Sequence, residues 1–132
     1  MRGANIRIDK GTERAVLELL KSQAEAKIYL FLLRKNGARS EQIIKGTKLH
    51  PSTVRELLSK MFSRKLIFRE KLKNDSIGKN PYIYRATPPI ILLQRRAKEL
   101  EEIFNKLANL THRTDGNNHQ VKISISERRE DK

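Results

Sequence analysis

The chain has 132 residues, and its 29 Lys and Arg outnumber its 15 Asp and Glu, which gives a formal net charge of +14. This length suits one compact domain, or a small domain with an appendage. The absence of cysteine excludes a disulfide framework, a thiolate metal site and a cysteine nucleophile. No apolar run reaches the roughly 18–20 residues of a membrane span, and no signal core follows the N-terminus. We therefore expect a soluble, cytoplasmic protein without a membrane partner.

The excess of positive charge indicates a polyanionic partner. Clustered Lys and Arg gain affinity for nucleic acids by releasing the counterions condensed on phosphates. The alternative is the charged surface of a thermophilic protein, but such surfaces enrich Lys and Glu together. Because the excess here has one sign, we favour the polyanion.

Residues 12–36 carry apolar side chains at helical spacing. Ser22 followed by Glu25 fits a capping box, which predicts a division into two helices at that point. Gly37 is expected to end the second helix. The apolar positions are Val16, Leu19, Leu20, Ala26, Tyr29, Leu30 and Leu33.

The next segments predict a helix-turn-helix. Ser40 offers a cap for a short helix, interrupted near Gly46 and Thr47, and Pro51 suits the first turn of a second helix that ends near Arg64. One face of the second helix is apolar, with Val54, Leu57, Leu58 and Met61. Its other face is polar and basic, with Ser52, Thr53, Arg55, Glu56, Ser59 and Lys60.

A β-hairpin should follow the two helices. Residues 66–72 and 82–86 are strand-like, and the intervening 74–81 are rich in turn formers. A helix-turn-helix followed directly by a basic hairpin is the order of a winged helix. We therefore predict a mainly α fold with a small β-hairpin wing, an α+β arrangement that occupies residues 1–88.

A long helix is expected over residues 89–111. Its apolar residues step by 3 and 4 positions, which is the pattern of a helix that pairs with another. The residues at this spacing are Ile90, Leu93, Ala97, Leu100, Phe104 and Leu107, and Ile103 widens the seam that they form. The seam either folds back on its own domain or pairs with the same helix of a second chain, and its regularity favours a homodimer. In the polar tail, residues 112–132, the alternation of Val121, Ile123 and Ile125 leaves a short strand or a loose end open.

These segments resemble the DNA-binding domain of archaeal TrmB-type transcriptional regulators and, more broadly, MarR-like winged-helix proteins. The resemblance rests on the stretches 25–33, 51–58 and 84–89, and it covers about residues 12–110. It implies a DNA-binding transcriptional regulator. Lys48 and Lys65 stand where such domains often carry Gly, so either these lysines are left-handed or the turns differ. Sugar regulators of this type also carry a large C-terminal effector domain, for which 132 residues leave no room, so we expect no sugar sensing.

The second helix of the predicted motif is the candidate recognition helix. Residues at its N-terminus and on its outer face would reach base edges and phosphates in the major groove. We expect base contacts from Ser52, Thr53 and Arg55 and phosphate contacts from Lys48 and Lys60. His50 would cap the helix or contact a phosphate, and Glu56 would pair with Lys60 rather than with a cytosine.

The hairpin carries further candidates for DNA contact. Arg69, Lys71, Lys73 and Lys79 would reach a minor groove or the phosphate backbone, although edge strands also carry Lys to prevent aggregation. Tyr82 and Tyr84 are expected to pack against the core rather than to stack on bases.

Catalytic and metal-binding patterns are missing from the sequence. The three histidines lack metal spacing, and the chain has neither a phosphate-binding glycine loop nor a nucleophile elbow. We expect a non-enzymatic protein without a cofactor, whose partners are double-stranded DNA, a second copy and the basal transcription machinery. An RNA- or ribosome-associated protein and a winged-helix module for protein contacts remain alternatives.

Overall fold

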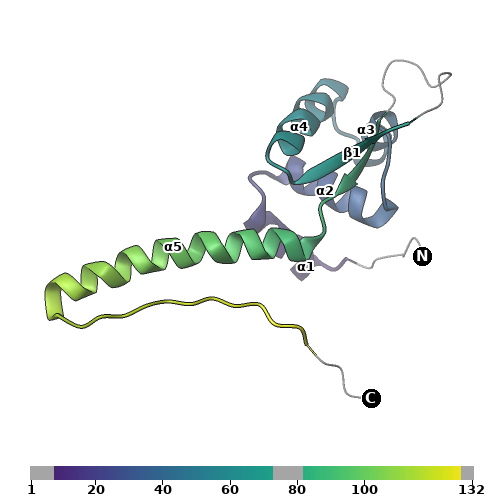
Figure 1. Ribbon diagram of the computed structural model, residues 1–132. Coiled ribbons are helices and arrows are strands. Elements are labelled where there is room, and N and C mark those ends of the chain that lie inside the picture. Colours follow the sequence, from purple (N-terminus) through teal and green to yellow (C-terminus); the bar gives the residue numbers. More distant parts are fainter. Residues whose placement is uncertain (1–7, 73–81, 129–132) are drawn as a thin grey trace. The chain divides into compact units, whose positions relative to one another are not determined.

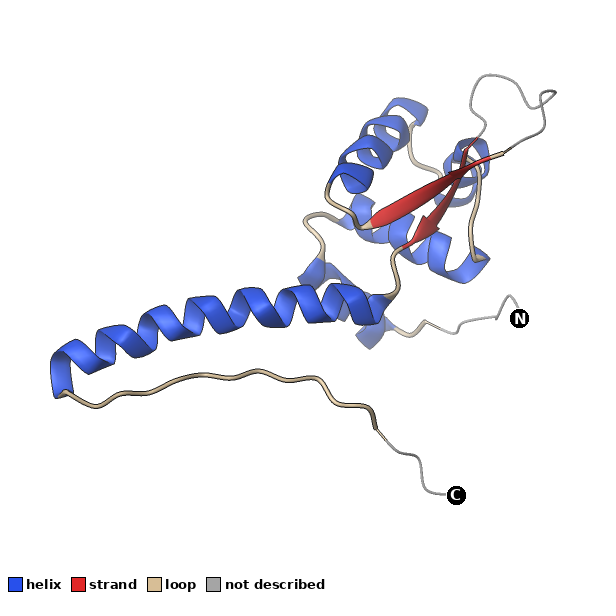
Figure 2. Cartoon of the chain, viewed as in Figure 1, coloured by secondary structure: helices blue, strands red, loops and turns tan. Residues whose placement is uncertain are grey.

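The computed structural model describes residues 8–72 and 82–128, and the chain divides into two compact units, residues 1–87 and 88–132 (Figure 1; Figure 2). The first unit contains α1 (Lys10–Leu19), α2 (Gln23–Lys35), α3 (Ser40–Thr47), α4 (Pro51–Ser63), β1 (Ile67–Lys71) and β2 (Tyr82–Ala86). The second contains α5 (Pro89–Asp115) and an extended tail. The predicted mainly helical fold with a hairpin wing and a long C-terminal helix is confirmed. None of the helices in the described ranges is long and apolar enough to cross a membrane.

The predicted division between α1 and α2 is confirmed by the hydrogen bonds at Ser22. Its hydroxyl accepts the Glu25 backbone N–H at 3.1 Å, and the Glu25 carboxylate accepts the Lys21 N–H at 3.2 Å. These bonds satisfy N–H groups that have no partner inside the helix. At α1, the Asp9 carboxylate accepts the Thr12 N–H at 2.8 Å, and this bond lowers the pKa of Asp9.

One prediction for α3 was wrong. Arg39, not Ser40, is the N-cap, and the Gln42 side chain accepts the Arg39 N–H at 2.8 Å. The interruption predicted near Gly46 and Thr47 is confirmed, because α3 ends at Thr47. The Thr47 hydroxyl donates to the Ile43 carbonyl at 2.7 Å, a bond that keeps a β-branched residue within the last turn.

The connections after three helices use left-handed residues. Asn36, rather than the predicted Gly37, caps the end of α2 with φ of 56°, and Gly37 follows with φ of 111°. Lys48 and Lys65 both have φ of 61°, which confirms the left-handed alternative for these positions. Non-glycine residues occupy this region at a cost of about 1–2 kcal/mol, so the surrounding turns must hold both lysines in place.

The core of the first unit is built around α2. This helix buries more than one face, because Ile28 and Leu32 are as inaccessible as the predicted Tyr29. A helix in the middle of a small domain is apolar on most sides, so a one-sided stripe underestimates its burial. The side chains with almost no exposure are Tyr29, Ile28, Leu32, Ile43, Met61, Ile67 and Val54.

The wing is a two-stranded antiparallel sheet in which Ile67 pairs with Ala86 and Arg69 pairs with Tyr84. Tyr84 is buried and its backbone also bridges to Ala38, which ties the hairpin to the segment before α3. The packing predicted for Tyr84 is therefore confirmed. The predicted turn at 74–81 lies outside the described residues.

In the second unit α5 runs four residues beyond the predicted end, to Asp115, and stops at the left-handed Gly116. The tail forms no strand in its described part but lies extended along α5. The Asn105 side chain accepts the Val121 N–H at 2.8 Å and donates to the Val121 carbonyl at 3.2 Å. The Glu101 carboxylate accepts the Ile123 N–H at 2.9 Å.

Candidate nucleic-acid interface

The helix α4 packs one face against the core and leaves its polar outer face exposed to solvent. Val54, Leu58 and Met61 are buried at the predicted 3–4 residue spacing. This packing turns the other side of the helix towards solvent, where five polar or charged side chains are exposed and Thr53 is half-buried. The exposed positions are Ser52, Arg55, Glu56, Ser59 and Lys60.

The N-terminus of α4 is closed by His50. Its Nδ1 accepts the Ser52 N–H at 3.2 Å and lies 2.9 Å from the Ser52 hydroxyl, which confirms the predicted cap. With Nδ1 acting as an acceptor, the neutral ring carries its proton on Nε2 and keeps one donor. Pro51 occupies the first turn, where a missing N–H costs nothing.

Arg55 differs from the other charged residues of α4 in having no partner. Within residues 8–72 and 82–128 its guanidinium makes neither a hydrogen bond nor an ion pair, and the residue is exposed. Lys60, by contrast, pairs with Glu56 at 3.2 Å, which confirms the predicted i,i+4 pair. Arg55 therefore keeps all of its donors free, and Glu56 offsets the charge of Lys60.

Lys48 lies between α3 and α4, where its left-handed backbone closes the last turn of α3. Its N–H donates to the Ile44 carbonyl, while its side chain is exposed. The lysine therefore presents an ammonium group immediately before the N-terminus of α4.

Arg69 of the wing is held between two aromatic rings. Its guanidinium carbon lies 4.2 Å from the centre of the Phe62 ring and 4.3 Å from the centre of the Tyr82 ring. Each contact of this kind contributes about 0.5–1 kcal/mol at an exposed site. Arg69 thus joins the hairpin to the C-terminal end of α4. Lys71 is exposed at the end of β1, and the predicted Lys73 and Lys79 lie outside the described residues.

The residues that anchor the C-terminal end of α4 were not predicted from the sequence. Arg64 donates to both carboxylate oxygens of Glu25 at 3.0 Å, and the Glu25 side chain is only 6% exposed. Phe62, which contacts Arg69, was likewise not predicted. The sequence signal for this contact was that Phe62 lies outside the predicted apolar face of α4 and close in sequence to a basic strand. An exposed aromatic ring in such a place suggests a contact with a cationic side chain.

The predicted dimerisation seam remains largely accessible along α5. Most of its members are 41–58% exposed, whereas Ala97 and Leu100 are half-buried. The exposed members are Ile90, Leu93, Ile103, Phe104 and Leu107.

In residues 8–72 and 82–128, no three acidic or histidine side chains gather as metal ligands.

Comparison with known proteins identifies a family. Residues 20–90, more than half of the chain, match the family model described as sugar-specific transcriptional regulator TrmB. A possible transcriptional regulator from Methanosarcina mazei Go1 shares the fold, with a TM-score of 0.63 at 18% identity over 85% of this chain and 99% of that one. No curated protein matches the chain. The matched region spans the helix-turn-helix, the wing and the start of α5, and the chain belongs to the TrmB family of transcriptional regulators.

Proposed function

We propose that the protein is a homodimeric regulator that reads specific double-stranded DNA sequences at promoters. The observation that carries this proposal is Arg55, an exposed arginine without a protein partner on the outer face of the second helix of a helix-turn-helix. A planar guanidinium can donate two parallel hydrogen bonds to the O6 and N7 atoms of guanine, which discriminates between bases by about 1–3 kcal/mol.

The neighbouring basic residues suit positioning rather than base reading. Lys48 and Lys60 carry flexible ammonium groups that would contact phosphates without reading sequence, and His50 keeps one ring donor for a phosphate. Ser52 and Thr53, at the N-terminal end of α4, would contact base edges together with Arg55. The net charge of +14 supports binding to a polyanion.

The same proposal assigns the exposed seam of α5 to a second copy. Exposed large apolar side chains at heptad spacing are costly to leave in water, and the seams of two copies would cover each other. A dimer would also present two recognition helices to half-sites about one helical turn apart.

Fluorescence-anisotropy titration tests DNA reading directly. A duplex selected from genomic DNA by the protein and a scrambled duplex are compared across a salt series. Arg55→Ala should weaken binding to the selected duplex by about tenfold and affect the scrambled duplex far less. Arg113→Ala, an equal loss of charge in α5, is the control. Equal affinity for both duplexes at every salt concentration would refute sequence reading.

Sedimentation tests the dimer. Leu107→Asp places a charge in the seam and should produce monomers, whereas Asn109→Asp adds the same charge on another face of α5 and should leave the dimer intact. An unchanged mass for Leu107→Asp would exclude the seam as the dimer interface.

A further inference from the structure

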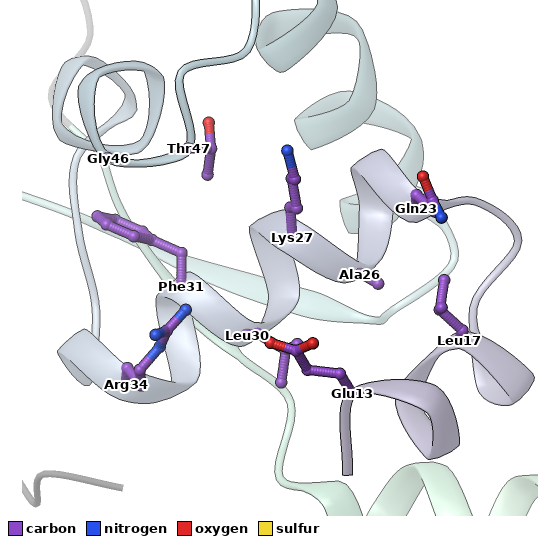
Figure 3. A pocket seen from close by; sticks show the side chains of 10 residues that line it. All are labelled: Glu13, Leu17, Gln23, Ala26, Lys27, Leu30, Phe31, Arg34, Gly46 and Thr47. Carbon is purple, nitrogen blue, oxygen red and sulfur yellow. The ribbon is translucent and has the colours of Figure 1, made fainter. Parts of the chain in front are cut away.

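A groove in the first unit is lined by residues of α1, α2 and α3 (Figure 3). Its floor is one stripe of α2, formed by Lys27, Leu30, Phe31 and Arg34 at the i, i+3, i+4 and i+7 spacing of a helix face. Figure 3 shows Glu13 and Leu17 of α1 on one side of this stripe and Gly46 and Thr47 of α3 on the other. The groove has a volume of about 260 Å³.

The two cations of the floor are not used by the fold. In the described ranges, neither Lys27 nor Arg34 makes a hydrogen bond or an ion pair, and both are exposed. Between them lie the buried Leu30 and the half-buried ring of Phe31. Glu13 is the one acidic residue of the lining, so the groove carries an excess of one positive charge.

We propose that this groove binds a small amphiphilic carboxylate. The apolar body would cover Leu30 and Phe31, and the carboxylate would accept hydrogen bonds from Lys27 or Arg34. Ligand sites combine an apolar lining with a few polar groups in this way, and their volumes run from about 300 to 1,000 Å³. The groove volume of about 260 Å³ lies just below that range, which favours a compact monoanion over a peptide or another macromolecule.

The groove is connected to the DNA-binding helix through α3. Gly46 lies so close to Phe31 that a Cβ at this position would overlap the ring, so the ring packs directly on the last turn of α3. The left-handed Lys48 and the cap His50 follow within four residues, and α4 begins at Pro51. A ligand that displaces Phe31 would therefore move the turn that positions α4. This regulatory part rests on the proposed function, whereas the binding site does not.

Titration with 4-phenylbutyrate, followed by amide chemical shifts of the full chain, tests the site without DNA. We expect shifts at residues 13–17, 27–34 and 46–47, with a weak, saturable affinity typical of a small ligand. The isosteric 4-phenylbutylamine carries the opposite charge and should bind several-fold more weakly. Equal binding of the amine, or shifts confined to the exposed seam of α5, would overturn the proposal.

A double variant assigns the charge selectivity to its residues. Lys27→Gln with Arg34→Gln should weaken 4-phenylbutyrate binding by about tenfold, the loss of one charge-assisted hydrogen bond. Lys98→Gln with Lys106→Gln removes the same charge from α5 and should leave the affinity unchanged. Comparable losses in both double variants would show that only net charge matters, and would refute the site.

Duplex titration with and without saturating 4-phenylbutyrate tests the link to DNA. The ligand should change the Kd for the selected duplex at least about twofold in the wild type and not in the Lys27→Gln/Arg34→Gln variant. A bound ligand with no effect on an intact DNA affinity would refute the regulatory link alone. A protein that binds the ligand but no DNA would refute the proposed function and leave the ligand site standing.

Discussion

The Tyr29 hydroxyl donates a hydrogen bond to the Thr87 carbonyl at 2.6 Å, within the buried core of the first unit. Thr87 is the residue that follows β2 and ends this unit, and its own hydroxyl donates to the Lys65 carbonyl at 3.0 Å. The central helix α2 is thus hydrogen-bonded to the residue that follows the wing, and that residue is hydrogen-bonded to the turn before β1. Fifty-eight residues separate the two partners, so this bond is purely tertiary.

Removing this bond should destabilise the domain. Tyr29→Phe keeps the ring but leaves the buried Thr87 carbonyl without its donor, which costs about 1–3 kcal/mol of unfolding free energy. Urea denaturation monitored by circular dichroism measures the loss. Tyr82→Phe, at a half-buried tyrosine, serves as the control and should change the unfolding free energy little.

The burial of Tyr29 should also make the stability of the domain depend on pH. Burial raises the pKa of Tyr29 to about 12, above its ordinary value of 10.0. Folding therefore favours the protonated phenol, so its stabilising contribution is complete below pH 10 and is lost as the pH rises to about 12. The wild type should lose more stability than Tyr29→Phe between pH 10 and 12. Parallel losses in the two proteins would contradict the assignment.

The Glu25–Arg64 pair should be important for the placement of α4. Arg64→Ala leaves the buried carboxylate of Glu25 without the guanidinium nitrogen that donates to both of its oxygens. Because the Arg64 side chain is 35% exposed and water can reach the site, we expect a loss of about 2–3 kcal/mol, below that of a fully buried pair. The melting temperature measures this loss, and Arg34→Ala is the control. Similar melting temperatures for both variants would show that the pair is not structural.

Variants of Lys48 can separate the effect of backbone strain on stability from the effect of charge on DNA binding. Lys48→Gly relieves the cost of a left-handed lysine but adds unfolded-state entropy, so a net gain of about 0.5–1 kcal/mol is expected. The same variant should weaken DNA binding. It should also lower the salt slope, the steepness with which log K for DNA falls with log salt concentration, by about one unit, because one phosphate contact is lost. Lys48→Ala loses the charge without relieving the strain. If Lys48→Gly gains stability but keeps the wild-type salt slope, Lys48 is not part of the DNA interface.

Arg69 should act on DNA binding partly by positioning the wing. Arg69→Lys retains the positive charge but loses the guanidinium contacts with the Phe62 and Tyr82 rings, so it should reduce affinity for the selected duplex nearly as much as Arg69→Ala. Phe62→Leu removes one ring and no charge, and it should lower affinity with an unchanged salt slope. Full affinity in both Arg69→Lys and Phe62→Leu would leave Arg69 as a simple phosphate contact.

The local features of this protein were determined by its sequence. The division at Ser22, the start of α4 at Pro51 and the return strand at 82–86 follow from caps, proline geometry and turn composition, which act within a few residues. The i,i+4 pair of Glu56 and Lys60 has the same origin, because both residues lie on one helix.

Tertiary structure decided which side chains were already engaged. Arg55 and Arg69 look alike in the sequence, yet one is without a partner in the described chain and the other is stacked between rings from α4 and β2. The bond from Tyr29 to Thr87, the burial of Glu25 beside Arg64 and the groove floored by α2 likewise join residues from distant segments. Such contacts depend on how the helices pack against one another. The spacing of residues in the sequence shows which face of an element is apolar, but it does not show which other element that face contacts.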